Sequence, residues 1–420
     1  MFARSGSRSF LRGVLTNVRS HSSTFPQKPD VVIIGGGVIG SSSAYFLSKE
    51  NPKLKVMLLE KDPTYQFCAT TRSAASIRHQ FSVKENIQIS QFGTEFLRNI
   101  NDYLSISGSD EKIEPQFKEN GYLFLASDAG KDILNSNISL QKQCGADIAA
   151  LNAEQVHEKF PWMYTSDISL GGLGVTGEGW FDPSILMNSF RNKARSQGVI
   201  CVHGNAQKIN CNKTGDLVES VTFLDVNGTE HTVDCGNVIN ASGAENARNF
   251  SLQIGRDIPV YAKKRCIFVF DSPDSGVQNC PLVVDPSGMY FRAEGKLFIT
   301  GIQPEDDPNV KPDDFDVDYD LFDETIWPLL ANRVPKFETL KVLNAWAGHY
   351  DHNLFDHNVI VGPDTKVKNF YFANGFSGHG LQQSPAIGRA LSELIIHEKF
   401  ITLDLSKFSI SRIDDNIPIQ

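Results

Sequence analysis

Several features that define common protein classes are missing from this sequence. The seven cysteines are scattered and odd in number, and none forms a Cys-x-x-Cys pair. This pattern argues against a disulfide framework or a cysteine zinc site and indicates reduced thiols in a core. No stretch approaches the ~18 consecutive apolar residues of a membrane-spanning helix, so we expect no transmembrane span, and peripheral attachment to a membrane stays open.

Acidic residues are also missing from the N-terminal segment, where the first one is Asp30. Residues 1–24 carry four arginines and six serines. Apolar residues recur there every three or four positions, which predicts a basic amphipathic helix typical of a mitochondrial presequence. Arg12, Asn17 and Arg19 interrupt the apolar stretches, which disfavours a secretory signal. A disordered basic tail is the alternative.

The charge of the remaining chain is negative. Without residues 1–24, 36 of the 40 basic residues stand against 49 acidic ones, and the formal charge changes from −9 to −13. This balance disfavours nucleic acid as a partner. About 395 residues then remain, enough for a large core and for two domains.

The clearest positive signal is a Gly-x-Gly-x-x-Gly motif, Gly35–Gly40, that follows a short apolar run. The run predicts a buried parallel strand, and the residues after the motif predict a helix through Leu47. In such a unit Gly35 permits the turn, Gly37 lets the backbone approach a pyrophosphate, and Gly40 lets helix and strand pack closely. A glycine-rich turn without a ligand is the alternative.

A second predicted strand, 55–60, ends in Glu60, twenty residues after Gly40. A carboxylate at this place accepts hydrogen bonds from both ribose hydroxyls and repels a 2′-phosphate, so NADP is disfavoured here. The acid therefore favours a bound dinucleotide over an empty turn.

A second glycine-rich motif, Gly375–Gly380, lies more than three hundred residues later. Ser384 and Pro385 predict the N-cap and first position of a helix over 386–396. The positive end of that helix would stabilise the anionic pyrimidine end of a reduced flavin. Together the two motifs predict one large flavin site. An ordinary loop before a packing helix is the alternative, and the second motif disfavours an NAD-dependent dehydrogenase.

The region between the motifs predicts a nucleotide fold that is interrupted and later resumed. A helix is predicted over 85–103, and further helices begin at Asn152 and Asp182. A buried strand over 238–244 returns the chain to the nucleotide sheet. Short strands after residue 259, separated by Pro, Gly and Asp, predict a mostly antiparallel substrate domain.

The loop 305–320 has nine charged residues, of which eight are acidic. Its spacing lacks the central glycine and the final glutamate of a calcium-binding loop. The sequence therefore favours a solvated surface over a metal site.

The two glycine motifs, the stretch 71–79 and the strand end Asn240–Ala244 resemble the D-amino-acid oxidase and sarcosine oxidase superfamily over nearly all of residues 29–405. The resemblance implies an α/β (α+β mixed) fold in which a Rossmann-like FAD-binding domain is interleaved with an antiparallel-sheet substrate domain. The predicted ranges are 29–115, 165–258 and 358–405 for the FAD-binding domain, 116–164 and 259–357 for the substrate domain, and 406–420 for a C-terminal tail.

The resemblance also implies which residues hold FAD. They are Gly35, Gly37, Val38, Ile39, Gly40, Glu60, Lys61, Thr70, Thr71, Arg72, Ser73, Ala206, Ala241, Gly243, Gly375, Ser377, Gly378, His379, Gly380 and Leu381.

Chemistry in this superfamily is usually oxidation of an amine carbon by hydride transfer to flavin, with a cation for the substrate carboxylate. The implied substrate is a small amino or N-methylamino acid. Candidate cations are Arg78 and Arg292, with Lys264 and Arg265 behind them, and Tyr350 could anchor the same carboxylate. Each has an alternative as a surface charge or a core-edge aromatic residue.

The sequence departs from the superfamily pattern in two places. Gly348 stands where covalently flavinylated members have a cysteine, and the early loop has no clear counterpart of the attachment histidine, so FAD is predicted to be non-covalent. Residues 299–303 lack the lysine and the Gly-Tyr-His segment used for oxygen activation and substrate polarisation. Electron transfer to a quinone or a carrier, or no turnover at all, is therefore a credible alternative to oxygen reduction.

Histidines and aspartates cluster between 349 and 357. No His-x-x-x-His pair or acid at ligand spacing completes a metal site, so an active-site lid or loop is favoured and no metal is predicted. His352 and His357 are candidate proton carriers.

The leader and the segments 344–351 and 375–390 most resemble a mitochondrial branch of the superfamily that is associated with assembly of respiratory complex I. This resemblance implies a matrix location or the matrix face of the inner membrane, with complex I subunits or assembly factors as partners. Two functions stay open: a flavin enzyme, and a catalytically silent flavoprotein that acts as an assembly factor.

Overall fold

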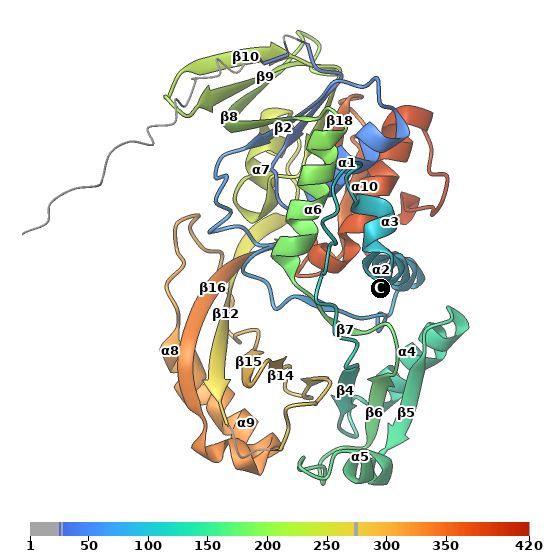
Figure 1. Cartoon of the computed structure of the whole chain (residues 1–420), viewed down its shortest axis with the longest axis vertical. Helices are drawn as coiled ribbons and strands as arrows, with labels where there is room; N and C mark the ends of the chain where they lie inside the picture. The colour runs from blue at the N-terminus through green and yellow to red at the C-terminus, as the bar shows by residue number, and fades with distance from the viewer. Residues whose placement is uncertain (1–24, 27, 273–275, 420) are drawn as a thin grey trace, which may run out of the picture.

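The structure is a computed structural model that describes residues 25, 26, 28–272 and 276–419. The predicted presequence, residues 1–24, lies outside the described residues. Figure 1 shows an upper lobe and a lower lobe, each built around a sheet. Within the described part of the chain, no helix is long and apolar enough to cross a membrane.

The upper sheet has eight strands in the order β10-β9-β8-β2-β1-β11-β18-β17. The five strands from β8 to β18 are parallel, with Ile33 paired between Leu58 and Ile239. The strands are β1 (Val31–Ile34), β2 (Val56–Glu60), β8 (Ile200–Cys211), β9 (Val218–Asp225), β10 (Glu230–Asp234), β11 (Asn237–Asn240), β17 (Ile360–Pro363) and β18 (Phe370–Asn374).

Helices cover both faces of this sheet (Figure 1). Ile33 packs into a cluster with one set of helices, whereas Val32 and Ile34 face the other layer. Because both faces are buried, β1 is a continuous apolar run. One layer contains α1 (Val38–Glu50), α2 (Lys84–Arg98), α3 (Ile100–Leu104), α6 (Pro183–Ser196) and α10 (Gly380–His397), and the other contains α7 (Gly243–Gln253).

Helices α1 and α10 pack against each other although they lie at opposite ends of the chain. The Ser42 hydroxyl donates to the Ser384 carbonyl at 2.7 Å. A Cβ atom added to Gly388 would lie 2.2 Å from Ser42 Oγ, so only glycine allows this approach. The helices that follow the two glycine motifs therefore form one packing unit.

The lower sheet has eight strands in the order β16-β12-β15-β14-β13-β4-β6-β5, and all its pairs are antiparallel except β13 with β4. A phenylalanine-rich core covers one face, where Phe270, Phe298 and Phe337 pack together. The strands are β4 (Tyr122–Ala126), β5 (Ile148–Asn152), β6 (Leu170–Gly174), β12 (Val260–Asp271), β13 (Leu282–Val284), β14 (Tyr290–Glu294), β15 (Leu297–Gly301) and β16 (Lys341–Asn353).

Shorter elements complete the chain. A small sheet pairs β3 (Ser76–Ile77) with β7 (Gly179–Trp180). The remaining helices are α4 (Lys131–Gln143), α5 (Ala153–Lys159), α8 (Tyr319–Leu321), a π turn (Phe322–Ile326), α9 (Trp327–Arg333), two 3-10 turns (Pro335–Thr339 and Ser406–Phe408) and α11 (Ser411–Asp414).

The predicted fold class is confirmed, because strands from distant parts of the chain share each sheet. The domain ranges stay a prediction. Strand β6, which falls inside the range 165–258 assigned to the FAD-binding domain, pairs with β4 in the lower sheet.

The predicted helix starts at Asn152 and Asp182 are confirmed. Asn152 forms a capping box with Gln155, and Asp182 accepts from the backbone N–H groups of Ser184 and Ile185. The single helix predicted over 85–103 is interrupted at Asn99.

The prediction that the last long helix starts at Ser384 and Pro385 is wrong, because α10 begins at Gly380 and Pro385 lies inside it. A proline within a helix leaves the carbonyl four residues earlier without its usual donor. Here the Ser384 hydroxyl donates to that carbonyl, on Leu381, at 2.9 Å. The helix N-terminus therefore lies within the glycine motif itself.

Candidate functional site

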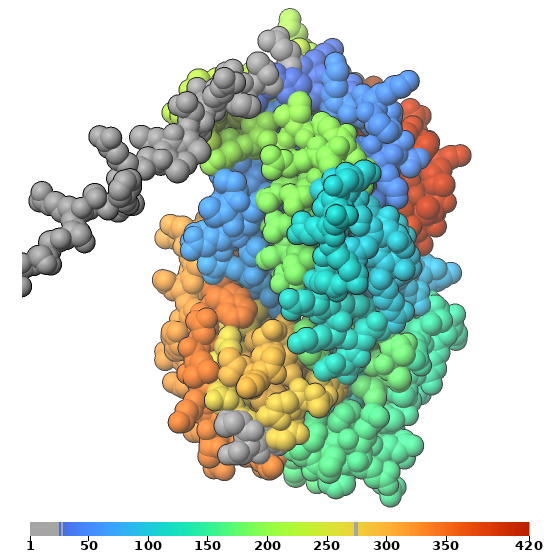
Figure 2. All heavy atoms as spheres, viewed as in Figure 1, coloured from blue at the N-terminus to red at the C-terminus, as the bar shows by residue number. Residues whose placement is uncertain are grey.

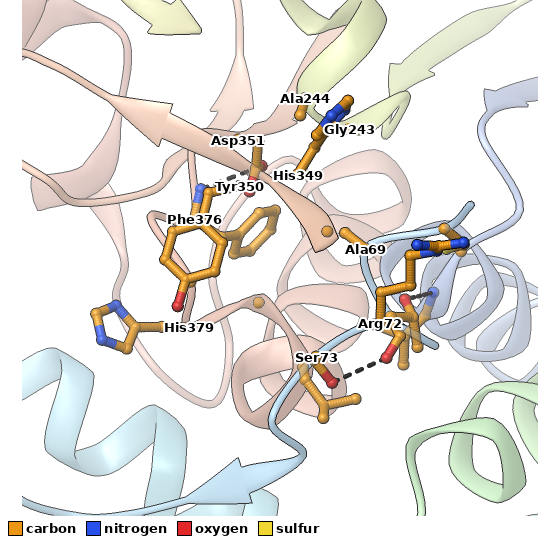
Figure 3. Close-up of a pocket in the computed structure, with 18 of the residues that line it drawn as sticks. Ala69, Arg72, Ser73, Gly243, Ala244, His349, Tyr350, Asp351, Phe376 and His379 are labelled. Carbon is orange, nitrogen blue, oxygen red and sulfur yellow. Dashed lines mark hydrogen bonds between the residues drawn. The ribbon is translucent and has the colours of Figure 1, made fainter. Parts of the chain in front are cut away.

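A cavity of about 410 Å³ is lined by residues of both sheets and both glycine motifs. Figure 3 shows Tyr350, Phe376 and His379 on one side of it and Ala69, Arg72 and Ser73 on the other. From the predicted FAD-binding set, the lining includes Gly35, Gly37, Val38, Ile39, Glu60, Lys61, Thr70, Arg72, Ser73, Ala241, Gly243, Gly378, His379, Gly380 and Leu381.

The first glycine motif is shaped by close backbone contacts. Gly35 has a φ of +101°, and a Cβ there would lie 2.3 Å from the carbonyl oxygen of Ala241. A Cβ at Gly40 would lie 1.9 Å from the carbonyl oxygen of Gly35. Both positions therefore require glycine, and the tight turn brings the first residues of α1 to the cavity wall.

Glu60 ends β2 beside this turn. Its Oε2 atom accepts the backbone N–H of Gly36 at 2.8 Å, and its Oε1 atom accepts that of Asp62 at 2.8 Å. Burial raises the pKa of the Glu60 carboxyl. The carboxylate is fixed at the cavity edge, where the ribose of a dinucleotide would meet it.

The turn 68–73 faces the start of α1. The Val38 backbone N–H donates to Thr70 Oγ1 at 3.2 Å, which ties the turn to the helix N-terminus. The Thr71 hydroxyl donates to the Tyr65 carbonyl at 2.6 Å and thus bonds inside the turn. The Ser73 hydroxyl donates to the Thr70 carbonyl at 2.9 Å.

The second glycine motif is held by the carboxylate of Asp351, which belongs to the cluster 349–357 that the sequence assigned to an active-site lid or loop. Asp351 Oδ2 accepts the backbone N–H groups of Gly375 and Phe376 at 2.9 and 3.2 Å (Figure 3). The Ser377 backbone N–H donates to the Asp351 carbonyl at 3.0 Å. Gly375 and Ser377 therefore shape this loop, although they do not line the cavity.

Of the predicted catalytic residues, the structure brings Arg78 and Tyr350 together at one end of the cavity. Arg78 Nη2 donates to His379 Nε2 at 2.9 Å, because a guanidinium has no acceptor. A Cβ at Gly378 would lie 2.6 Å from the Tyr350 ring, so the glycine lets this ring lie against the loop. Burial and the nearby Arg78 lower the pKa of His379 to about 3, which keeps the imidazole neutral at physiological pH.

Aromatic rings surround the Arg78 guanidinium. Its central carbon lies 4.5 Å from the ring centroid of Phe81, 5.2 Å from that of Phe124 and 5.8 Å from that of Tyr122. The Arg78 backbone N–H donates to Gln382 Oε1 at 2.8 Å. These contacts hold a cation in a largely apolar environment.

Arg292 and His352 do not line the cavity. The Arg292 guanidinium donates to the carbonyl of Ala74 at 2.9 and 3.1 Å, pairs with Glu294 and stacks on Trp180. His352 is buried beside His357, and burial lowers its pKa to about 4. The predicted FAD-contact residues Gly40, Thr71 and Ala206 also lie outside the cavity lining, and Ala206 is paired with Phe223 in the upper sheet.

Further lining residues were not singled out from the sequence: Tyr122, Phe124, Phe315 and Gln382. Gln382 could have been predicted from the sequence, because it follows Gly380 of the second glycine motif by two residues on the same helix. The aromatic residues come from strands of the lower sheet and a distant loop, and no local pattern marks them.

The loop 305–320 is not the simple solvated surface expected from its charge. Phe315 stacks on His349 with ring centroids 4.1 Å apart, and His349 Nε2 bonds the Asp314 carbonyl at 2.7 Å. Figure 2 shows the orange segment of the chain beside the blue one, in agreement with the 4.8 Å between the Phe315 and Phe67 rings. Basic and aromatic residues of β12 and β16 attract the loop onto the cavity wall. Within the described residues, no cluster of His, Cys, Asp or Glu is placed to hold a metal ion.

A family model described as FAD dependent oxidoreductase (DAO) matches residues 30–394. The chain belongs to this family. The predicted superfamily is thereby confirmed, and so is the FAD cofactor. The residues present fit FAD, because the tight turn at Gly35, which leaves no room for a Cβ, and the Glu60 carboxylate fixed beside it have the arrangement that a dinucleotide requires. FAD is held non-covalently, in line with Gly348 at the position where covalent members have a cysteine.

Related proteins align with this DAO family member over most of its length. FAD-dependent oxidoreductase domain-containing protein 1 of Xenopus laevis is 44% identical, over 94% of this chain and 84% of that protein. Mitochondrial sarcosine dehydrogenase of Mus musculus is 25% identical, over 90% of this chain and 40% of that protein.

The solved structure of L-proline dehydrogenase from P. horikoshii has a TM-score of 0.80 at 24% identity, covering 94% of this chain and 100% of that one. Glycine oxidase from Geobacillus kaustophilus has a TM-score of 0.76 at 21% identity, covering 92% and 99%. At these identities the two structures establish the fold alone.

Proposed function

We propose that this chain is a mitochondrial oxidoreductase that oxidises the carbon beside the nitrogen of a small amino or N-methylamino acid, with Arg78 as the anchor of the substrate carboxylate. One observation carries the proposal: the Arg78 guanidinium lies at the cavity wall among aromatic rings, with a neutral histidine as its side-chain partner. A half-buried cation without a carboxylate bonded to it favours an anionic ligand.

The other residues at this end of the cavity orient the substrate and exclude water. Tyr350 and Tyr122 offer hydroxyl groups near Arg78, and burial raises the pKa of both, so they remain protonated donors. Phe124 and Phe376 supply apolar wall. A substrate held in this way is positioned rather than chemically activated by the protein.

When bound, FAD supplies the hydride acceptor. We assign its binding to the predicted residues that line the cavity, with Gly40, Thr71, Gly375 and Ser377 shaping the turns from behind. Catalytic roles for Arg292 and His352 are not part of the proposal, because both side chains are engaged outside the cavity.

The test is anaerobic reduction of the flavin absorbance, scanned over small amino and N-methylamino acids, after acid precipitation has been shown to release FAD into the supernatant. We expect one substrate class to bleach the flavin within seconds. Arg78→Gln should abolish bleaching, whereas Arg248→Gln, which removes an exposed arginine paired with Asp257, should not. Equal bleaching rates in both variants would overturn the role of Arg78.

A second candidate function is supported by strand β15 and the residues after it. Residues 299–303 place no lysine or histidine at the cavity, and Thr300 donates to the Tyr290 carbonyl instead. This favours a flavoprotein that does not reduce oxygen, and the role we propose for such a protein is a part in assembly of respiratory complex I. Reduction of the flavin by dithionite but by none of the amino or N-methylamino acids, together with co-purification of complex I subunits, would favour this function over the first.

A further inference from the structure

Three arginines line the cavity, Arg72, Arg78 and Arg265, and they differ in the groups that contact each guanidinium. Arg72 lies between the rings of Phe67 and Phe315, 4.8 and 4.9 Å from their centroids, and it donates to main-chain carbonyls. Because Phe67 is 49% exposed, this stack lies at the solvent side of the cavity. Arg265 is buried in the cavity wall, whereas Arg78 is half-buried there.

Arg265 is neutralised by a residue of the loop 305–320. Its Nη1 and Nη2 atoms donate to the two carboxylate oxygens of Asp307 at 2.7 and 2.8 Å, a bidentate pair. The Arg265 side chain is only 8% exposed and that of Asp307 15%, so water screens the pair weakly. Lys263 bonds the Asp307 carbonyl and fixes the same loop residue.

Tyr350 lies near both Arg265 and Arg78. The central carbon of the Arg265 guanidinium is 4.9 Å from the centroid of the Tyr350 ring. Both Arg265 and Arg78 act electrostatically on the Tyr350 hydroxyl. Both guanidinium groups therefore lie near Tyr350, and all three side chains line the cavity in which a small substrate would lie.

We infer that Asp307, which does not itself line the cavity, determines specificity by neutralising the cavity-lining Arg265, so that the site accepts substrates with one carboxylate and rejects dicarboxylates. This inference rests on the proposed function, in which Arg78 takes the first carboxylate. A second substrate carboxylate near Arg265 would lie close to the negative charge of Asp307. Two like charges repel strongly in a site that water screens weakly.

The same loop offers a matched control. Asp314 pairs with Lys264 at 2.7 Å, and Lys264 does not line the cavity. Asp307→Asn and Asp314→Asn each remove one negative charge from one loop, yet only the first frees a cation that faces the cavity.

The experiment is a titration of the FAD-loaded protein with acetate and, separately, with malonate. Binding of each anion is monitored through the change in flavin absorbance. In Asp307→Asn we expect the dissociation constant for malonate to fall about tenfold relative to that for acetate, because a charge-assisted hydrogen bond to Arg265 becomes available. Asp314→Asn should keep the native ratio of the malonate and acetate dissociation constants. The double variant Arg265→Gln/Asp307→Asn should restore that native ratio.

Three results would overturn the inference: an unchanged ratio in Asp307→Asn, an equal shift in Asp314→Asn, or a shift that persists in the double variant. Loss of FAD from Asp307→Asn would also overturn it, since the pair would then serve cofactor retention. Arg78→Gln separates this inference from the proposed function. If that variant binds acetate as tightly as the native protein does, the anchor role of Arg78 fails, whatever the malonate ratio shows.

Discussion

Asp351 Oδ2 accepts the backbone N–H of Gly375 at 2.9 Å and thereby joins strand β16 of the lower sheet to the glycine motif that opens α10. The carboxylate also accepts the N–H of Phe376, and desolvation of this half-buried group raises its pKa to about 6. The position of the second glycine motif thus depends on a strand that belongs to the other lobe.

Replacing Asp351 should therefore weaken FAD binding. Asp351→Ala leaves two buried N–H groups without an acceptor, at a cost of about 1–3 kcal/mol. Asp351→Asn keeps an oxygen acceptor and should lose less. The FAD dissociation rate, measured by the recovery of flavin fluorescence after dilution, tests this order. Faster release from the Asn variant than from the Ala variant would contradict it.

A buried carboxyl behind Arg78 predicts a pH dependence of stability. Glu178 accepts from the His79 backbone N–H at 2.6 Å and from Gln80 Nε2 at 2.8 Å, and burial raises its pKa to about 7. Because the folded pKa lies above the unfolded one, the folded state binds this proton more tightly, and stability falls as pH rises from about 4.5 to 7.

Glu178→Gln should remove that part of the pH dependence. The difference in unfolding free energy between the variant and the native protein should grow in favour of the variant between those pH values, by up to about 3 kcal/mol, and then level off. Chemical denaturation at several pH values measures it. A difference that does not vary with pH would refute the assignment to Glu178.

The turn at the first glycine motif should not tolerate a side chain. Gly40→Ala places a Cβ 1.9 Å from a backbone oxygen, and we expect destabilisation of at least ~1–3 kcal/mol together with loss of bound FAD. Gly130→Ala is the control, because a Cβ there meets its nearest neighbour at 3.5 Å. The FAD-to-protein absorbance ratio and thermal unfolding distinguish the two variants.

The hydroxyl of Ser384 should matter because of the proline that follows it. Ser384→Ala removes the donor to the Leu381 carbonyl, which should cost about 1 kcal/mol. In the background of Pro385→Ala, the new backbone N–H can reach that carbonyl, so the same serine substitution should cost less. A double-mutant cycle of unfolding free energies measures this coupling, and purely additive effects would contradict it.

Local signals in the sequence were sufficient to predict the elements around the first glycine motif and two of the helix starts. Gly35, Gly40 and Glu60 are marked by spacing alone, and the caps at Asn152 and Asp182 by residue type. The start of α10 was misplaced because Pro385 normally ends or begins a helix, and the compensation by Ser384 depends on the folded geometry. The ion pair of Arg265 with Asp307 joins residues 42 positions apart through sheet pairing and a loop path, which no local pattern encodes.

The packing of α1 against α10 has a consequence for the order in which the protein can be made. The Ser42–Ser384 hydrogen bond spans 342 positions, and β18 joins the upper sheet beside β11 late in the chain. During synthesis the first glycine motif and α1 are complete long before β18 and α10 emerge, so α1 stays uncovered until then. A nascent chain stopped before α10 would expose the apolar face of α1 and lack half of the flavin cradle, so cofactor capture is a late event and the unfinished chain depends on protection until then.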